Sequence, residues 1–133
     1  MNYHKKIGKE SYLFAETNLD IETVRLYLED EQKQDFFKTE IFKKLEKESS
    51  PISVLCDLYV GVSERQNGFA KSLMFNYFKD VKSKYHLLVT NKTNDSKRFQ
   101  IEEFYKEYGF EVVLEDREFS VMLKGLKKIW FFL

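Results

Sequence analysis

The fold of this chain is decided by two runs separated by four residues, Val54-Leu55-Cys56-Asp57-Leu58-Tyr59-Val60 and Arg65-Gln66-Asn67-Gly68-Phe69-Ala70. The first run has the apolar character of a strand, and from Phe69 onward apolar residues recur at helical spacing. A strand therefore passes into a helix at Gly68. The first N–H groups of a helix lack intrahelical acceptors and carry the positive end of the helix dipole, so this turn suits an anion such as phosphate.

Gly68 leaves two interpretations of the turn open. A glycine would let a pyrophosphate approach the backbone without a Cβ in the way, and the small side chain of Ala70 keeps the position beside it accessible. A tight connection between a strand and a helix would use the same residues. Short motifs match by chance often enough that the turn alone does not decide between a ligand site and a connection.

The turn and a second segment further along the chain together match two sequence motifs of one protein family. Its pattern, Arg65-x-x-Gly68-x-Ala70, resembles motif A of the GNAT superfamily of acyl-CoA N-acyltransferases, whose consensus is [Arg/Gln]-x-x-Gly-x-[Gly/Ala]. Downstream, Glu103-Phe104-Tyr105-Lys106-Glu107-Tyr108-Gly109-Phe110-Glu111 resembles motif B of that superfamily, a helix that carries a tyrosine and closes on Gly-Phe. The two motifs have the family's order and about its separation, and the resemblance covers about residues 54–123.

The resemblance implies an α/β (α+β) fold, with one domain over residues 1–133 and a mixed, mostly antiparallel sheet flanked by helices. It also implies acetyl-CoA as the cofactor. The backbone of Tyr59 and Val60 would pair with the pantetheine arm as an added strand does, and the amides from Gln66 through Lys71 would hold the pyrophosphate. The predicted cofactor-binding residues are Tyr59, Val60, Arg65, Gln66, Asn67, Gly68, Phe69, Ala70, Lys71 and Asn94.

Three of these predicted contacts involve side chains. Arg65 and Lys71 would add charge-assisted hydrogen bonds to the phosphates, although a cation beside such a loop is as often merely exposed. Many family members place an asparagine before the tyrosine of motif B, at a spacing that falls here on Arg98. Asn94 is the predicted replacement for that asparagine.

Tyr105 has the position of the tyrosine that protonates the departing coenzyme A thiolate in many family members, so the resemblance makes it the candidate general acid. A phenol with a pKa of about 10 is protonated at neutral pH and can donate to a thiolate whose conjugate acid has a pKa of about 8.5. The alternative is that Tyr105 only packs in an aromatic stripe, as neighbouring Tyr108 is expected to do. No general base is assigned, because Asp57, Glu64, Glu22 and an ordered water all remain open.

Composition and charge exclude several classes of protein. The 133 residues suffice for one domain, and 13 Phe with 8 Tyr supply a large core. Lys plus Arg and Asp plus Glu each number 22, which argues against a general nucleic-acid binder. The single cysteine, Cys56, excludes an internal disulfide, and its place in an apolar strand suits a small buried hydrophobe better than a nucleophile. His4 and His86 have no partners at metal-ligand spacing, so no metal is assigned.

Both ends of the chain bear on its location and partners. Residues 1–10 are polar and lack the apolar core of a signal peptide, and no apolar run reaches membrane-spanning length, so a cytoplasmic location is expected. The apolar end, residues 129–133, is expected to dock either on its own core or on a partner subunit. A monomer and a homodimer therefore both remain open.

The segments outside the two motifs have less certain patterns. Residues 21–30 fit a helix capped by Asp20, but Thr23, Val24 and Tyr27 favour extended structure and hence a strand that completes a hairpin. Residues 31–48 have a helical stripe, a departure from the family pattern that would shape the acceptor side. The other predicted elements are strands at 11–16, 85–90, 110–114 and 119–124, a turn at 17–20, and helices that begin near residue 69 and end at Gly109.

The predicted function is direct transfer of an acetyl group from acetyl-CoA to an acceptor amine. The alternative is a binding or inhibitory module that keeps the fold without the chemistry and acts on a protein partner. Rossmann and P-loop fingerprints require more glycines than this turn contains, so a nucleotide-binding fold is less consistent with the sequence. The acceptor stays open among protein amines, small-molecule amines and aminoacyl-tRNA.

Overall fold

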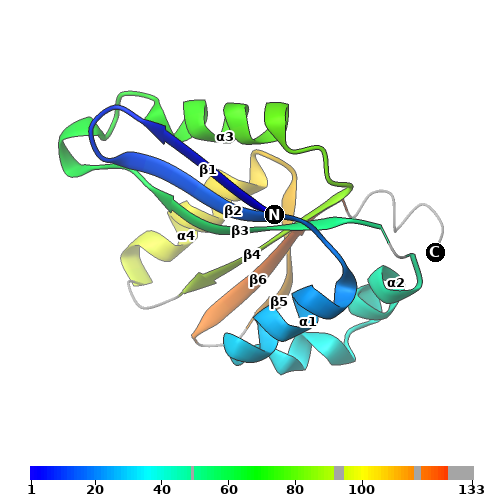
Figure 1. Cartoon of the computed structure of the whole chain (residues 1–133). Helices are drawn as coiled ribbons and strands as arrows, with labels where there is room; N and C mark the ends of the chain where they lie inside the picture. Colours follow the sequence, from blue (N-terminus) through cyan, green and yellow to red (C-terminus); the bar gives the residue numbers. More distant parts are fainter. Residues whose placement is uncertain (49, 92–94, 116–117, 126–133) are drawn as a thin grey trace.

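The protein forms one six-stranded sheet with helices on both faces (Figure 1). The structure, a computed structural model, describes all residues except 49, 92–94, 116–117 and 126–133, and it describes no side chains within residues 91–100. The strands lie in the order β1-β2-β3-β4-β6-β5. Their bounds are β1 (Asn2–Ile7), β2 (Ser11–Leu19), β3 (Ile52–Tyr59), β4 (Tyr85–Asn91), β5 (Phe110–Glu115) and β6 (Phe119–Lys124).

One pair of neighbouring strands, β3 with β4, is parallel, and the other neighbours are antiparallel. This arrangement confirms the predicted mixed, mostly antiparallel sheet. The parallel pair needs a long crossover connection, and helix α3 provides it. The helical segments are α1 (Ile21–Asp30), η1 (Gln34–Lys38), α2 (Glu40–Glu48), η2 (Val62–Glu64), α3 (Phe69–Asp80) and α4 (Asp95–Lys106).

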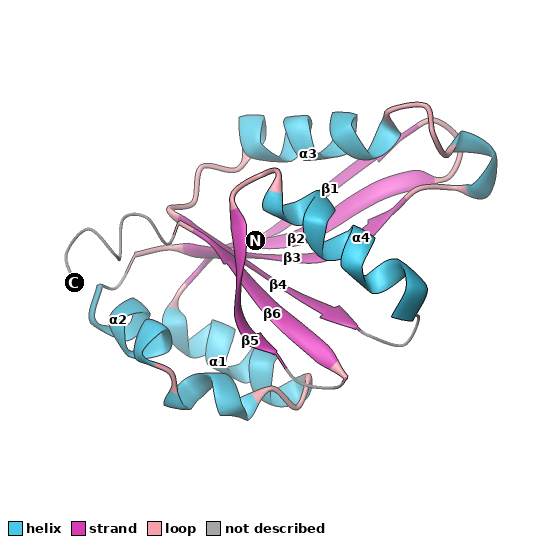
Figure 2. Cartoon of the chain, turned by 180° about the vertical axis from the view of Figure 1, so that it is seen from behind, coloured by secondary structure: helices cyan, strands magenta, loops and turns pink. Residues whose placement is uncertain are grey.

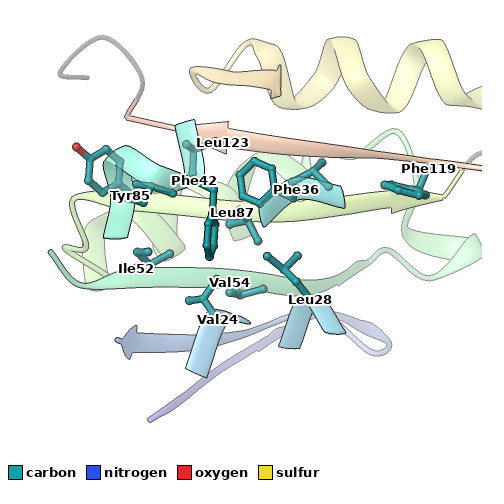
Figure 3. Packing of buried hydrophobic residues seen from close by; sticks show 12 residues of the cluster. Val24, Leu28, Phe36, Phe42, Ile52, Val54, Tyr85, Leu87, Phe119 and Leu123 are labelled. Atoms are coloured by element: carbon teal, nitrogen blue, oxygen red, sulfur yellow. The ribbon is translucent and has the colours of Figure 1, made fainter. Parts of the chain in front are cut away.

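Each face of the sheet has its own buried core. Figures 1 and 2 show α3 and α4 on one face and α1, η1 and α2 on the other. The core under α1, η1 and α2 contains Val24, Leu28, Phe36, Phe42, Ile52, Val54, Tyr85, Leu87, Phe119 and Leu123 (Figure 3). The core under α3 and α4 contains Leu13, Leu55, Leu73, Met74, Tyr77, Leu88, Tyr105, Phe110 and Met122. Full burial stabilises each such side chain by about 1.5–3 kcal/mol.

Residues 21–30 form helix α1, so the predicted strand at this position is wrong. Asp20 caps the helix, because its Oδ1 accepts a hydrogen bond from the Thr23 N–H at 2.8 Å. Val24 and Leu28 are fully buried, whereas Leu26 between them is 61% exposed. Alternation would have put all three on one side, so burial at helical spacing overrides the extended preference of the individual residues.

The apolar stripe of residues 31–48 predicted one helix. The structure instead has the short η1 followed by α2. The break falls at Thr39, which is extended (φ −78°, ψ 150°). Its Oγ1 accepts a hydrogen bond from the Phe42 N–H at 3.2 Å and thereby caps α2. Phe42 and Leu45 of the predicted stripe are buried. The apolar periodicity was therefore sound, and the side-chain cap interrupts it.

The first strand, β1, was not predicted, and the turn predicted at residues 17–20 is largely part of β2. β1 pairs along its whole length with β2, from Asn2 opposite Glu16 to Ile7 opposite Ser11. It lies at the edge of the sheet, and its polar side chains hide the strand pattern that an interior strand would show.

Candidate functional site

A gap opens in the middle of the sheet between β3 and β4. Their parallel ladder consists of Ile52–Tyr85, Ser53–His86 and Val54–Leu87, yet β3 continues to Tyr59 and β4 to Asn91. The β2–β3 register shifts between the pairs Ala15–Leu55 and Phe14–Asp57, a bulge that gives β3 one extra residue and bends it. Figure 2 shows the carboxyl ends of the two strands pointing apart. The backbone groups that face the gap are thus free to pair with an extended ligand.

The loop beyond β3 brings the start of α3 to the end of this gap. Gln66 (φ 65°) and Gly68 (φ 78°) both have left-handed backbone conformations. Gly68 is the N-cap residue, no side chain caps the helix, and the first helical bond runs from the Ser72 N–H to the Gly68 carbonyl. In the described chain, the amides of residues 69–71 therefore have no acceptor. Amides of this kind can donate to an anion, and the anion site predicted here from the sequence stays a prediction.

Gly68 has a conformational role and leaves space beside it. A positive φ favours glycine, and a Cβ added here would meet no heavy atom within 4 Å. Close packing against another part of the protein is therefore not the reason for a glycine at position 68. An open, uncapped helix start with glycine at its N-cap fits the diphosphate of a coenzyme A group.

Two cations flank the turn. Arg65 is exposed, and its Nε donates a hydrogen bond to the Val60 carbonyl at 3.2 Å. This bond closes the loop and holds the guanidinium beside the turn. Lys71 is exposed on the first turn of α3, and neither residue forms an ion pair within the described part of the chain. Both side chains are therefore exposed beside the turn, and their predicted contacts with phosphates stay a prediction.

The side chain of Phe69 packs against the β1–β2 turn. Its ring packs against Gly8 of the β1–β2 turn, where a Cβ would lie 2.4 Å from the ring and 1.8 Å from Glu64 Oε2. The Glu64 carboxylate accepts hydrogen bonds from the Lys9 and Glu10 N–H groups at 2.8 and 2.9 Å. These bonds lower the pKa of Glu64, that from Glu10 most strongly. Glu64 is therefore a structural anchor that fixes the loop against the β1–β2 turn, and it is not available as a general base.

Tyr105 lies in the core on the face of the sheet that α3 and α4 cover, and it is 9% exposed. Its ring contacts Phe104 and Phe110, with centroids 5.2 and 5.8 Å away. Burial raises the pKa of Tyr105 to about 12, and the Asp57 carboxylate adds to the increase. The phenol is thus kept protonated. No described residue forms a hydrogen bond with its hydroxyl, so it can donate to an incoming group.

The remaining predicted residues differ in their surroundings. Tyr59 is 38% exposed and packs on Tyr12, and Tyr108 stacks on Phe78 as the packing alternative predicted for it. Gln66 and Asn67 are exposed, and Ala70 is half-buried. Asn94 lies outside the described residues. Of the candidate bases, Glu22 is exposed on α1, which covers the other face of the sheet. Among the three side chains considered as a general base, Asp57 lies on the part of β3 that borders the gap.

Sequence reasoning missed three buried polar residues on the α4 side of the sheet. They are Thr90 on β4, Glu102 on α4 and Ser120 on β6. A signal was present, because Glu102 precedes Tyr105 by one helical turn and thus shares the face of α4 that packs on the sheet. Ile101, the apolar residue just before Glu102, is 41% exposed instead.

A cavity of about 920 Å³ lies at the opposite end of β4, and its lining includes Lys84, His86, Gly109 and Lys124. It is remote from the gap, and the predicted site residues do not line it. His86 is buried there, its Nδ1 is 2.7 Å from the Tyr77 hydroxyl, and burial lowers the pKa of His86 to about 4. The gap, with its anion site and unpaired backbone, is the more specific candidate.

The described residues contain neither a metal-binding cluster nor a membrane-spanning helix. No group of three or more His, Cys, Asp or Glu side chains is placed to hold a metal ion. No helix in that part of the chain is long and apolar enough to cross a membrane. Cys56 is half-buried at the bulge of β3, and burial raises the pKa of its thiol to about 11, which suits a packing residue.

No family model and no curated protein matches this sequence. Among solved structures, NAA60 from Arabidopsis thaliana in complex with a bisubstrate analogue is similar, with a TM-score of 0.52 and 16% identity over 85% of this chain. An N-acetyltransferase from Staphylococcus aureus Mu50 is similar with a TM-score of 0.50 and 12% identity over 92% of this chain. The chain spans 62% of the first structure and 68% of the second.

The protein therefore has the GNAT fold, a mixed sheet with a parallel central pair and helices on both faces. Of these two solved structures, the one from Staphylococcus aureus is named as an N-acetyltransferase, and the one from Arabidopsis thaliana contains a bisubstrate analogue. The roles assigned to Tyr105 and to the cofactor-binding residues stay predictions.

Proposed function

We propose that this protein is an acetyl-CoA-dependent N-acetyltransferase that transfers the acetyl group directly to an acceptor amine. One observation carries the proposal. The parting of β3 from β4 beyond Val54 and Leu87 exposes unpaired backbone, and this gap ends at the uncapped start of α3. An extended arm that ends in a diphosphate fits such a combination.

The chain supplies separate contacts for the two parts of coenzyme A. Unpaired backbone near Tyr59 would pair with the amides of the pantetheine arm, although the Val60 carbonyl already accepts from Arg65. The amides of residues 69–71 would donate to the pyrophosphate, with Arg65 and Lys71 beside it. Contacts through the main chain make the geometry of the turn more important than the side chains of Gln66 and Asn67.

Acetyl-CoA supplies an activated acetyl group, and the protein supplies position and protons. Asp57 on β3 and Tyr105 on α4 come from opposite sides of the gap, and the charge of Asp57 helps keep the Tyr105 phenol protonated. A protonated phenol can stabilise and protonate a departing thiolate. Tyr105 is accordingly proposed as the general acid of the reaction.

Calorimetry and thermal unfolding with coenzyme A and acetyl-CoA test the first half of this proposal. A ligand at a hundred times its Kd stabilises a folded protein by about 2.7 kcal/mol, so the melting temperature should rise by several degrees. Mass spectrometry after incubation of candidate amines with labelled acetyl-CoA tests the second half. Binding without transfer to any amine would favour the non-catalytic module, whereas no binding at all would end the proposal.

A further inference from the structure

Four aromatic rings lie together on the half of the sheet made of β1, β2 and β3. His4 lies opposite Phe14 in the β1–β2 ladder, and Tyr12 lies opposite Tyr59 in the β2–β3 ladder. The ring centroids are 6.4 Å apart for His4 and Phe14, 5.9 Å for His4 and Tyr12, and 5.8 Å for Tyr12 and Tyr59. These four residues form a ring cluster that, in the described part of the chain, belongs to neither buried core.

The ring cluster lies on the face of the sheet opposite α3. The side chains that alternate with it along the strands, among them Ile7, Leu13 and Leu58, pack in the core under α3 and α4. On the face of the ring cluster, helices α1 and α2 lie away from the β1–β2 turn in both views of the fold (Figures 1 and 2). Two of the four rings are exposed and two are half-buried. An aromatic surface of this kind that is open to solvent marks an interaction site.

The rings of the cluster are tilted against one another and are not stacked face to face. The angle between the ring planes is 36° for Tyr12 and Tyr59 and 60° for each of the two pairs that contain His4. The rings therefore do not use up one another's faces. A flat π-system such as a nucleobase stacks on aromatic side chains that are presented in this way.

Two cations stand beside the ring cluster. Lys6 lies opposite the ring of Tyr12 in the β1–β2 ladder, and Lys9 lies in the turn that follows β1. Both side chains are exposed, and neither forms an ion pair within the residues that the structure describes. Two neighbouring carboxylates are directed elsewhere, since Asp57 accepts a phenolic hydrogen bond and Glu10 lies against the loop after β3. The two lysines are thus available to an anionic ligand.

We propose that the ring cluster binds single-stranded nucleic acid, with bases stacked on the rings and phosphates beside Lys6 and Lys9. The inference goes beyond the proposed acetyltransferase function and does not depend on it. Base–aromatic stacking accepts any base, because every base has a π-face, and lysines neutralise the phosphates between the bases. An acidic peptide would satisfy the lysines and leave the rings unused, so the combination favours a single strand. A zero net charge is compatible with this site, because a short strand needs few cations.

The first test separates stacking from charge. Fluorescence anisotropy measures binding of a labelled oligouridylate of about ten nucleotides, a length within the range that such surfaces occupy. An abasic strand of the same length carries the phosphates without the bases. The oligouridylate should bind at least about fivefold more tightly than the abasic strand. No binding of the oligouridylate, or equal affinities for the two strands, would overturn the inference.

A ring variant with a matched control locates the bases on this face. Phe14→Thr removes one ring and keeps a residue that favours strands, so the affinity for the oligouridylate should fall by about fivefold or more. Phe75→Ala removes a ring that is 68% exposed on α3, and it should bind as the wild type does. His4→Thr, at an exposed position of the edge strand, is the second ring variant if Phe14→Thr does not fold. Equal affinities in the ring variants and in Phe75→Ala would refute the proposed surface.

The charge variants test the phosphate contacts. The logarithm of affinity falls with the logarithm of salt concentration by about 0.7 for each phosphate that a single strand loses to a cation. Lys6→Gln should reduce this slope by about that amount, whereas Lys79→Gln, which removes an exposed lysine of α3, should leave it unchanged. The same slope in both variants would exclude Lys6 as a phosphate contact and contradict the inference.

A competition experiment separates this surface from the proposed coenzyme A site. Oligouridylate binding should persist when coenzyme A is present at saturation, and coenzyme A affinity, measured by calorimetry, should be the same in His4→Thr as in the wild type. Displacement of the oligouridylate by coenzyme A would put the strand at the start of α3 and overturn the inference. A wild type that binds the oligouridylate but not coenzyme A would end the proposed function and leave this inference standing.

Discussion

The phenol of Tyr12 donates a hydrogen bond to Asp57 Oδ2 at 2.7 Å, which fixes the carboxylate that borders the gap between β3 and β4. Tyr12 lies on β2, so the half of the sheet made of β1, β2 and β3 positions a charge that acts on a residue of α4. The Asp57 charge contributes to the raised pKa of Tyr105, after burial. The bulge that bends β3 and the protonation of Tyr105 are thereby linked through one side chain.

Replacing Tyr105 with Phe should lower turnover and leave coenzyme A affinity unchanged, because proton donation matters only as the carbon–sulfur bond breaks. General acid catalysis is worth about a hundredfold to ten-thousandfold, and the rate should fall within that range. Steady-state kinetics with calorimetry separates the two effects. Tyr108→Phe is the control, since Tyr108 packs on Phe78 and should be nearly silent. Equal, small effects in both variants would make Tyr105 a packing residue.

Gly68→Asp and Gly68→Asn form a matched pair at the start of α3. Asparagine and aspartate both tolerate a left-handed conformation, and the added side chain meets open space, so both variants should fold. They differ by one charge beside the proposed pyrophosphate site. The aspartate should weaken coenzyme A binding by about tenfold or more relative to the asparagine, measured by calorimetry at low salt. Equal affinities would place the phosphates elsewhere.

His86 should make the protein sensitive to acid. Burial lowers the pKa of His86 to about 4 in the folded state from a usual value of 6.5. The unfolded chain therefore binds a proton first as the pH falls, and stability is lost between pH 6.5 and 4. At pH 5 the loss should be about 2 kcal/mol. Urea unfolding at pH 7 and pH 5 should show a smaller difference for His86→Gln than for the wild type. The same difference in both proteins would contradict this prediction.

Thr90→Val should stabilise the ligand-free protein. The buried hydroxyl has no partner among the described residues, and removing an unsatisfied polar group of this kind gains about 1 kcal/mol. Thr39→Val gives a contrast of opposite sign, because Thr39 caps α2 and its loss should cost about 1 kcal/mol. Urea unfolding of the three proteins measures both changes. A loss of stability in Thr90→Val would show that its hydroxyl is satisfied in solution.

The sequence predicts the strands and helices of the two motifs well, because their apolar periodicity coincides with burial in the folded protein. Phe69 begins α3 and Gly109 (φ 94°) ends the helical turn after α4, both as predicted. The failures occur where a single contact decides the structure. Asp20 capping and the burial of Val24 turn residues 21–30 into a helix, and Thr39 divides the stripe of residues 31–48.

Part of the candidate site could be predicted from the sequence for a similar reason. A turn that binds through its backbone has a local signature, so Gly68 and its neighbours could be proposed from spacing. Thr90, Glu102 and Ser120 come from three separate elements, and only the packing of α4 on the β4–β6 ladder brings them together. Glu64 was a candidate base in sequence, and its partners at Lys9 and Glu10 are 55 and 54 residues away along the chain.

The gap also divides the sheet mechanically. Three register pairs join the half made of β1, β2 and β3 to the half made of β4, β6 and β5, whereas β4 and β6 share six. The centre of a sheet normally exchanges its amide hydrogens most slowly. Here the amides of residues 56–59 and 88–90 that point into the gap should exchange with deuterium sooner than those of the β4–β6 ladder. This sheet therefore opens first along its middle, and a bound ligand would close that seam.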